Sequence, residues 1–444
     1  MDSNSNPVRE LELLRDLIVS SVDIVKATIT EHQDPQLTLD AIEEHPIFQR
    51  ENQAVSYALK TIGSAGQMLR ALCDPHIYLN DFTYGYHDQT SLLVACQADI
   101  PSHLENGPLE IGELANLTNL NGGVLARFLR NLCNSHIFRE IEANKFANNS
   151  LSVRYKSETW KAIVGHCVDG GRPASCKVWD AMSDPEYKDS TEPTKSPFNI
   201  AYNTSLDYFA YTKTVRPEMA ERTQRAMGGK AFNLEEFLSL YPWAEQKNAH
   251  IVDVGGAIGA ATLPILRAFP GLSLTVQDQP ESQPLFEKHL TERFSDVVGV
   301  SNTRFVSLDF FKECPVHGAE IYFLRHVIHD WPDTEAIRIL KTCASAMIQG
   351  SKLLICEHMV CPTYHTAGDK ESGANSQAAP EPLLANWGNA PTSRLDLQVY
   401  TFLNAKQRTR VEYELLAKQA GLELVQVWRN LGDLSIVECQ LRRE

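Results

Sequence analysis

From about residue 249 onward, short apolar runs alternate with amphipathic helical stretches, and this rhythm limits the fold more than any other feature of the chain. Alternation of this kind indicates parallel strands joined by crossover helices, so we predict a doubly wound α/β domain. Strands are expected at 251–254, 272–276, 304–307, 320–324, 352–356, 422–428 and 434–441. Helices are expected at 261–269, at 333–350, where Asp333 can cap the helix and Gly350 ends it, and at 409–419.

A second domain is expected before this part, because 444 residues exceed what one hydrophobic core usually organises. Helical patterns at 11–25 and 54–72 are followed, between 109 and 149, by a helix, a turn, a second helix, a strand and a turn. That order is typical of a winged helix. We therefore predict a mostly helical, winged-helix-like domain over residues 1–185 and an α/β domain over residues 186–444.

The charge of the chain restricts its partners. Lys and Arg total 41 against 56 Asp and Glu, a formal net charge of -15. Binding to nucleic acid or to an anionic membrane needs clustered positive charge, so both are disfavoured, and a small neutral or aromatic molecule is the expected substrate. The second helix of the winged-helix-like segment offers mainly Arg127 and Arg130, which favours packing or dimerisation over DNA reading.

Targeting and cysteine patterns point to the cytoplasm. The first ten residues lack the basic stretch of a signal peptide, and no run of about 18 apolar residues predicts a transmembrane helix. The ten cysteines are scattered without a Cys-x-x-Cys pair. That spacing favours buried, reduced thiols over a metal or redox site.

One segment, residues 362–391, breaks the alternation. It is rich in Gly, Ala, Ser, Pro and Asn and shows little periodicity. We predict a flexible surface insertion, and its place after the fifth strand puts it on the ligand-binding side of such a sheet.

The first expected strand runs into Gly255 and Gly256, and the second ends at Asp278. Glycines at such a turn let the backbone approach a ligand closely, and the carboxylate can accept hydrogen bonds from ribose hydroxyls. The dinucleotide pattern G-x-G-x-x-G fails, because Ala257 and Ala260 stand where glycine is required. A nucleoside without a pyrophosphate fits better, and a purely structural corner is the alternative.

A second candidate site follows the fourth strand, in the segment from Arg325 to Asp333 that contains His326 and His329. A single histidine is as often structural as functional. Glu357, however, ends the neighbouring fifth strand, so its carboxylate could reach the His329 imidazole and fix its tautomer. The two residues together suggest a general base and the group that orients it.

On these motifs, the stretch from about residue 198 to 441 resembles the plant-type small-molecule O-methyltransferases, the caffeic acid O-methyltransferase group, and most of all its fungal branch that methylates polyketide hydroxyls. The motifs that carry the resemblance are Val252-Asp253-Val254-Gly255-Gly256, Gln277-Asp278-Gln279-Pro280, Leu308-Asp309-Phe310-Phe311, Leu324-Arg325-His326-Val327-Ile328-His329-Asp330-Trp331, Ile355-Cys356-Glu357 and Leu403-Asn404-Ala405-Lys406-Gln407-Arg408-Thr409. It implies a Rossmann-like, mostly parallel sheet whose last strand is antiparallel. It also implies S-adenosylmethionine as cofactor, and a homodimer formed through the winged-helix-like region.

The resemblance also assigns roles to single residues. Those that contact the cofactor would be Gly255, Asp278 on the ribose, Asp309 and Phe310 at the adenine, and Arg325. His329 matches the catalytic base, Glu357 the first acidic residue beside it, and Gln407 the second acidic position. Three departures accompany the match: Ala257 replaces a glycine, Arg325 replaces a lysine, and Gln407 replaces an acid and so supplies no charge.

The acceptor pocket is less defined. A helix over 396–404 would place Gln398 and Phe402 on one face, and in the resembled family this helix lines the pocket, to which His326 could also contribute. A structural role for these three side chains is the alternative. The leading hypothesis is a methyltransferase acting on a phenolic or polyketide-type hydroxyl without a metal ion. The alternatives are a non-catalytic, dimeric binding or regulatory relative and a nicotinamide oxidoreductase.

Overall fold

The computed structural model describes residues 6–50, 52–228, 234–297, 303–307, 309–314, 316–365, 379–388 and 390–442. Two compact units are present. The helical unit comprises Met1–Pro173, Thr212–Lys230 and Ala379–Trp387, and the sheet unit comprises Ala174–Tyr211, Ala231–Ala378 and Gly388–Glu444. The boundary expected after residue 185 stays a prediction.

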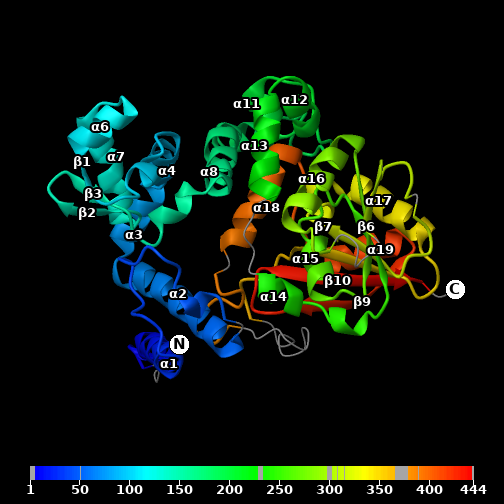
Figure 1. Cartoon of the computed structure of the whole chain (residues 1–444), viewed down its shortest axis with the longest axis horizontal. Coiled ribbons are helices and arrows are strands. Elements are labelled where there is room, and N and C mark those ends of the chain that lie inside the picture. The colour runs from blue at the N-terminus through cyan, green and yellow to red at the C-terminus, as the bar shows by residue number, and fades with distance from the viewer. Residues whose placement is uncertain are drawn as a thin grey trace. The chain divides into compact units, whose positions relative to one another are not determined.

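The helical unit contains the two long N-terminal helices and a small mixed segment (Figure 1). Its helices are α1 (Arg9–Glu31), α2 (Gln53–Cys73), α3 (Pro75–Tyr84), α4 (Tyr86–Gln97), α5 (Ile100–His103), α6 (Ile111–Thr118), α7 (Gly122–Asn134), α8 (Glu158–Val164) and α13 (Pro217–Gly228). A π-helix at Gly165–Gly171 follows α8. The boundaries between the two units fall within α9 (Arg172–Ser175) and α12 (Tyr208–Thr214). Short 3-10 turns lie at Pro46–Phe48 and Ser152–Lys156.

The helix, turn, helix and strand expected between 109 and 149 are present. A capping box of Glu110 and Glu113 starts α6, and the Asn121 side chain accepts the N–H of Val124 at the start of α7. The strands β1 (Leu109–Glu110), β2 (Arg139–Glu142) and β3 (Lys145–Ala147) form an antiparallel sheet in the order β1-β3-β2. Leucines from both helices pack with Phe138 and Phe146 in one buried cluster.

The sheet unit is built on seven strands in the order β6-β5-β4-β7-β8-β10-β9, in which β10 runs antiparallel to both of its neighbours, β8 and β9, and the other pairs are parallel. The predicted α/β sheet with an antiparallel last strand is confirmed. The strands are β4 (His250–Val254), β5 (Ser273–Asp278), β6 (Thr303–Ser307), β7 (Ile321–Arg325), β8 (Lys352–His358), β9 (Leu422–Arg429) and β10 (Leu434–Leu441). The helices are α10 (Val178–Ser183), α11 (Pro197–Tyr202), α14 (Leu234–Ser239), α15 (Thr262–Ala268), α16 (Gln283–Arg293), α17 (Asp333–Ala346), α18 (Ala390–Leu403) and α19 (Arg410–Gln419). Further 3-10 turns lie at Trp243–Glu245, Pro280–Ser282 and Ile328–Asp330.

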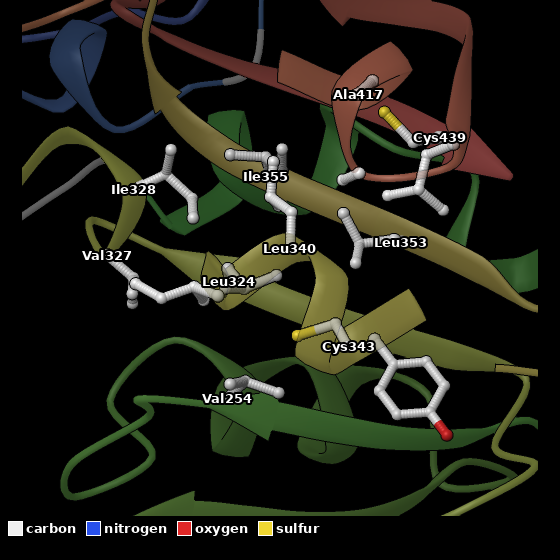
Figure 2. Close-up of a cluster of buried hydrophobic side chains, with 14 of the residues drawn as sticks. Val254, Leu324, Val327, Ile328, Leu340, Cys343, Leu353, Ile355, Ala417 and Cys439 are labelled. Atoms are coloured by element: carbon white, nitrogen blue, oxygen red, sulfur yellow. The ribbon is translucent and has the colours of Figure 1, made fainter. Parts of the chain in front are cut away.

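Buried apolar side chains cover both faces of this sheet, as a doubly wound fold requires. On one face, residues of β7 and β8 such as Leu324 and Leu353 pack with Leu340 of α17 and Ala417 of α19 (Figure 2). On the other face, side chains of α14, α15 and α16 cover the same strands. The two cores fix where the strands end, and therefore where the loops that follow them begin.

The expected surface insertion, 362–391, is described only in part, because residues 366–378 and 389 lie outside the described residues. Ala379 and Leu383 are buried in one cluster with Leu14 of α1 and Ala65 of α2, and the Trp387 ring meets Tyr57 at 5.0 Å. This part of the segment is therefore packed into the helical unit, which its composition did not indicate.

Within the described ranges, no helix is both long and apolar enough to cross a membrane.

Candidate active site

The predicted site residues lie where neighbouring parallel strands end. Val254 of β4 pairs with Gln277 of β5, and Arg325 of β7 pairs with Cys356 of β8. Because β4 also pairs in parallel with β7, the loops after all four strands leave from the same edge of the sheet. This carboxyl edge is where open α/β sheets bind ligands.

The turn after β4 brings its backbone close to neighbouring side chains. Gly255 has φ +74°, and a Cβ there would lie 2.9 Å from Val327 Cγ2 and 3.6 Å from Phe310 Cε1. A Cβ at Gly256 would overlap the Asp253 carboxylate. Ala257, which stands in place of the expected glycine, adopts the left-handed conformation with φ +47°. Only glycine suits positions 255 and 256, because side chains already fill the space around them.

Asp278 lies beside this turn. Its Oδ2 accepts the Ala257 N–H at 2.7 Å and its Oδ1 accepts the Gln279 N–H at 2.6 Å. Burial raises the pKa of the carboxyl group. A strand-end carboxylate against a glycine turn fits a nucleoside, since vicinal ribose hydroxyls can donate to it while the backbone of the turn approaches closely. S-adenosylmethionine therefore fits these residues.

Asp309 and Phe310 lie on the adjoining loop. Asp309 Oδ1 accepts the Phe311 N–H at 3.1 Å, and Lys312 lies 2.8 Å from its Oδ2 and lowers the pKa of the carboxyl. The Phe310 ring is edge-on to Trp331, with centroids 6.1 Å apart. Phe310 thus borders the Gly255 turn, and its expected contact with an adenine ring stays a prediction.

Arg325 and Asp253 lie inside the unit. The Arg325 guanidinium carbon is 5.7 Å from the centroid of the Phe237 ring, and burial lowers the pKa of this side chain. Burial also raises the pKa of Asp253 to about 7, against a hydrogen bond of 2.6 Å from the Thr262 hydroxyl that lowers it. The direct cofactor contact expected of Arg325 stays a prediction.

His329 lies in the 3-10 turn Ile328–Asp330 that follows β7, and it is only 6% exposed. The Gln407 amide nitrogen is 2.5 Å from its Nδ1, and Asp330 Oδ1 is 3.4 Å from its Nε2. Both ring nitrogens therefore face polar side chains, and the expected neighbour Gln407 is brought to the imidazole.

Glu357 holds the same turn through the main chain. Its Oε1 accepts the backbone N–H of His329 at 3.0 Å, and its Oε2 accepts the Tyr413 hydroxyl at 2.5 Å. Burial raises the pKa of this carboxyl, while Tyr413 and the Arg408 charge oppose the shift. The sequence suggested contact between this carboxylate and the imidazole ring, whereas these hydrogen bonds orient the residue from its backbone.

His326 also lies at this edge, with its ring centroid 5.0 Å from that of His329 and 5.3 Å from that of His358. Its φ of +54° is left-handed, which costs a non-glycine residue on the order of 1 kcal/mol. The fold therefore holds three imidazoles side by side at the carboxyl ends of β7 and β8.

The two expected pocket residues of α18 differ in their surroundings. Phe402 is buried at 3% exposure in an aromatic cluster, 4.7 Å from the Tyr208 ring and 5.9 Å from the Phe198 ring. Gln398 is half-buried, and its amide nitrogen has no hydrogen-bond partner among the described residues. Gln398 is thus the one with a side-chain donor left to offer an acceptor molecule.

The sequence predicted no role for three residues of this region: Asp330, Tyr413 and Arg408. Asp330 directly follows His329 in the quoted motif, so adjacency was a usable signal. Tyr413 lies 56 residues after Glu357, and neither spacing nor periodicity connects the two.

Comparison with known proteins places the chain among methyltransferases. Residues 179–423 match the family described as O-methyltransferase domain. The 3-O-methyltransferase 2 of Phanerochaete chrysosporium is 32% identical over 96% of this chain and 97% of its own length. Among solved structures, the mitomycin 7-O-methyltransferase MmcR is 25% identical with a TM-score of 0.65, covering 84% of this chain and 99% of that one. OxaC in complex with SAH and oxaline is 23% identical with a TM-score of 0.71, over 97% of this chain and all of that one, and shows the shared fold.

The raised pKa of Asp253 predicts a pH-dependent stability. In the folded protein the Asp253 carboxyl keeps its proton up to about pH 7, whereas its ordinary pKa, which applies to the unfolded chain, is 3.8. Because the folded state binds this proton more tightly than the unfolded state, the free energy of unfolding contributed by Asp253 is highest below about pH 4. It falls as the pH rises toward about 7. Asp253→Asn is neutral at every pH and can still accept from Thr262. Its free energy of unfolding relative to the wild type should rise by about 2–4 kcal/mol between pH 5 and pH 8.

Urea unfolding at the two pH values measures this difference. Asp189→Asn, whose side chain is 86% exposed, is the control and should show no comparable change. If Asp253→Asn has the same pH dependence as the wild type, the buried carboxyl does not titrate in this range.

Proposed function

This chain belongs to the S-adenosylmethionine-dependent O-methyltransferases of secondary metabolism, and from that premise we propose that His329 is the general base that deprotonates a phenolic or polyketide-type hydroxyl. The observation that carries the proposal is the His329 ring itself. It is buried at the carboxyl edge of the sheet, with Gln407 at Nδ1 and Asp330 beside Nε2. When bound, the cofactor supplies a methyl group that its sulfonium already activates.

The energetic requirement matches what one base provides. A phenol with a pKa near ~10 costs roughly 4 kcal/mol to ionise at neutral pH. A positioned general base contributes ~10²–10⁴-fold, which is of similar size. His329 Nε2 takes the hydroxyl proton, the acceptor oxygen keeps the electron pair, and the Asp330 carboxylate 3.4 Å away stabilises the imidazolium that forms.

Gln407 can support this step despite its lack of charge. An amide offers both a donor and an acceptor, and turning it end for end exchanges the two. With Oε1 toward Nδ1, the amide accepts the Nδ1–H and leaves the proton-accepting role to Nε2. A glutamate could only accept, so glutamine selects the productive tautomer less strongly.

Gly255, Asp278, Asp309, Phe310 and Arg325 are proposed to hold the cofactor. Asp278 would accept the ribose hydroxyls, in exchange for its present contact with the turn. Gln398, His326 and Phe402 are proposed to line the acceptor site. A ring-bearing acceptor is supported by the aromatic side chains of α12 and α18 in this region.

His329→Ala tests the base directly. We expect turnover to fall by about 10²–10⁴-fold, because the variant loses the proton acceptor. Affinity for S-adenosylmethionine should stay within about twofold, since no cofactor contact is removed. Methyl transfer from labelled S-adenosylmethionine to a panel of phenols measures the first quantity, and calorimetry measures the second. Turnover at the wild-type rate in this variant would exclude His329 as the base.

We further propose that two copies associate through the helical unit. None of the residues of α3 is buried, and its apolar side chains are largely exposed, with Ile77 at 53%, Leu79 at 64% and Phe82 at 73%. A helix with this much exposed apolar surface indicates a protein interface.

Light scattering should therefore give twice the mass of one chain. Phe82→Glu should lower it toward a single chain, because a buried charge opposes association. Leu415→Glu, at a 53% exposed position of α19, should leave the mass unchanged. A wild-type protein that scatters as one chain at micromolar concentration would exclude the dimer.

A further inference from the structure

Arg408, the neighbour of Gln407, has a completely buried side chain with 0% exposure. Arginine stays charged at any pH that proteins tolerate, so a buried guanidinium needs compensating acceptors. The positions of these acceptors therefore show which parts of the structure the side chain connects.

Two of the acceptors are backbone carbonyls on either side of His329. Nη1 donates to the carbonyl of Ile328 at 2.8 Å, and Nη2 donates to the carbonyl of Trp331 at 2.7 Å. One planar group therefore brackets the turn Ile328–Asp330 at both ends.

The third acceptor is Asp333, at the start of α17. Its Oδ1 accepts from Nε at 3.0 Å and from Nη2 at 2.9 Å. The sequence suggested that Asp333 caps this helix, but Pro332 is the N-cap and forms no side-chain cap bond. The carboxylate accepts from Arg408 instead, which fixes the guanidinium along its Nε–Nη2 edge while Nη1 and Nη2 hold the turn.

The main chain of Arg408 is fixed as well. Its carbonyl accepts the N–H of Val360 at 3.0 Å, and residue 408 forms an isolated parallel bridge with Met359, just after β8. Thr409 and Glu412 form the capping box that starts α19. With its backbone anchored to these two elements, the side chain cannot follow the turn if the turn moves.

We propose that Arg408 is a positioning residue that sets the distance between the Gln407 amide and the His329 imidazole. Residue 407 faces the ring and residue 408 holds the turn that carries the ring, so one short segment determines both ends of that contact. The role rests on the proposed function of His329, since Arg408 acts only through it.

Arg408→Lys is the informative substitution. A single ammonium group keeps the positive charge and the pairing with Asp333, but it cannot bridge two carbonyls as a planar fork does. We expect kcat to fall about tenfold to a hundredfold, because a displacement near 1 Å of a catalytic group has effects of this size. KM for the acceptor and affinity for S-adenosylmethionine should change by about twofold or less.

Lys406→Met is the matched control. Lys406 also lies near Asp333, 3.4 Å from Oδ2, and it pairs with Glu412 at 2.7 Å. The substitution removes a charge from the same segment without releasing the carbonyls of residues 328 and 331. We expect this variant to retain kcat within about twofold.

A double variant separates positioning from general destabilisation. If Arg408 acts through the contact between Gln407 and His329, Gln407→Ala combined with Arg408→Lys should have a kcat close to that of the slower single variant. Multiplicative losses, or a wild-type kcat in Arg408→Lys, would overturn the proposal.

Two further variants, Asp333→Ala and His329→Ala, distinguish failure of this proposal from failure of the proposed function. If Arg408→Lys does not fold, Asp333→Ala replaces it, because the Asp333 side chain is 51% exposed. This variant removes the outer anchor and should lower kcat about threefold to tenfold, and an unchanged kcat would overturn the proposal. Turnover preserved in His329→Ala would instead refute the proposed function, whatever Arg408 does.

Discussion

The position of one short turn, Ile328–Asp330, is the constraint on which the proposed chemistry of this protein depends. Three contacts hold it: the Glu357 carboxylate on the His329 N–H, the Gln407 amide on the ring, and the Arg408 guanidinium on the flanking carbonyls. Each of these side chains is at most 3% exposed. Buried hydrogen bonds without competing water fix geometry well, because leaving any of them unmade is costly.

The sheet explains how these distant residues meet. Parallel pairing of β7 with β8 brings the loop after Arg325 next to Glu357, and the antiparallel β10 follows on the far side of β8. The segment before α19 joins them through its bridge at Met359. The glycine turn after β4, the Asp278 carboxylate at the end of β5 and the turn after β7 all lie at the same edge of the sheet, so the residues proposed for the cofactor and for the base share that edge.

Much of this could be predicted from the sequence. The α/β alternation located the strands to within one or two residues, because two hydrophobic cores impose apolar runs on them. The strand-end positions of Asp278 and Glu357, and the place of His329 in the loop after β7, followed from the predicted order of strands. The partners of these side chains could not be predicted from the sequence. Whether Glu357 bonds to the ring or to the backbone N–H of His329 depends on the exact path of the loop, since a shift of about 3 Å would exchange one hydrogen bond for the other. The burial of Ala379 and Leu383 was not predicted either, because two apolar residues in a mostly polar segment give no periodic pattern.

A crystal structure of the protein with S-adenosylhomocysteine and a methylatable phenol would show directly whether His329 is the general base. We expect the acceptor oxygen to lie about 3 Å from His329 Nε2, with Gln407 still at Nδ1 and Arg408 still bound to the carbonyls of Ile328 and Trp331. An acceptor hydroxyl beyond about 4 Å from that nitrogen, or hydrogen-bonded to a different titratable side chain, would contradict it.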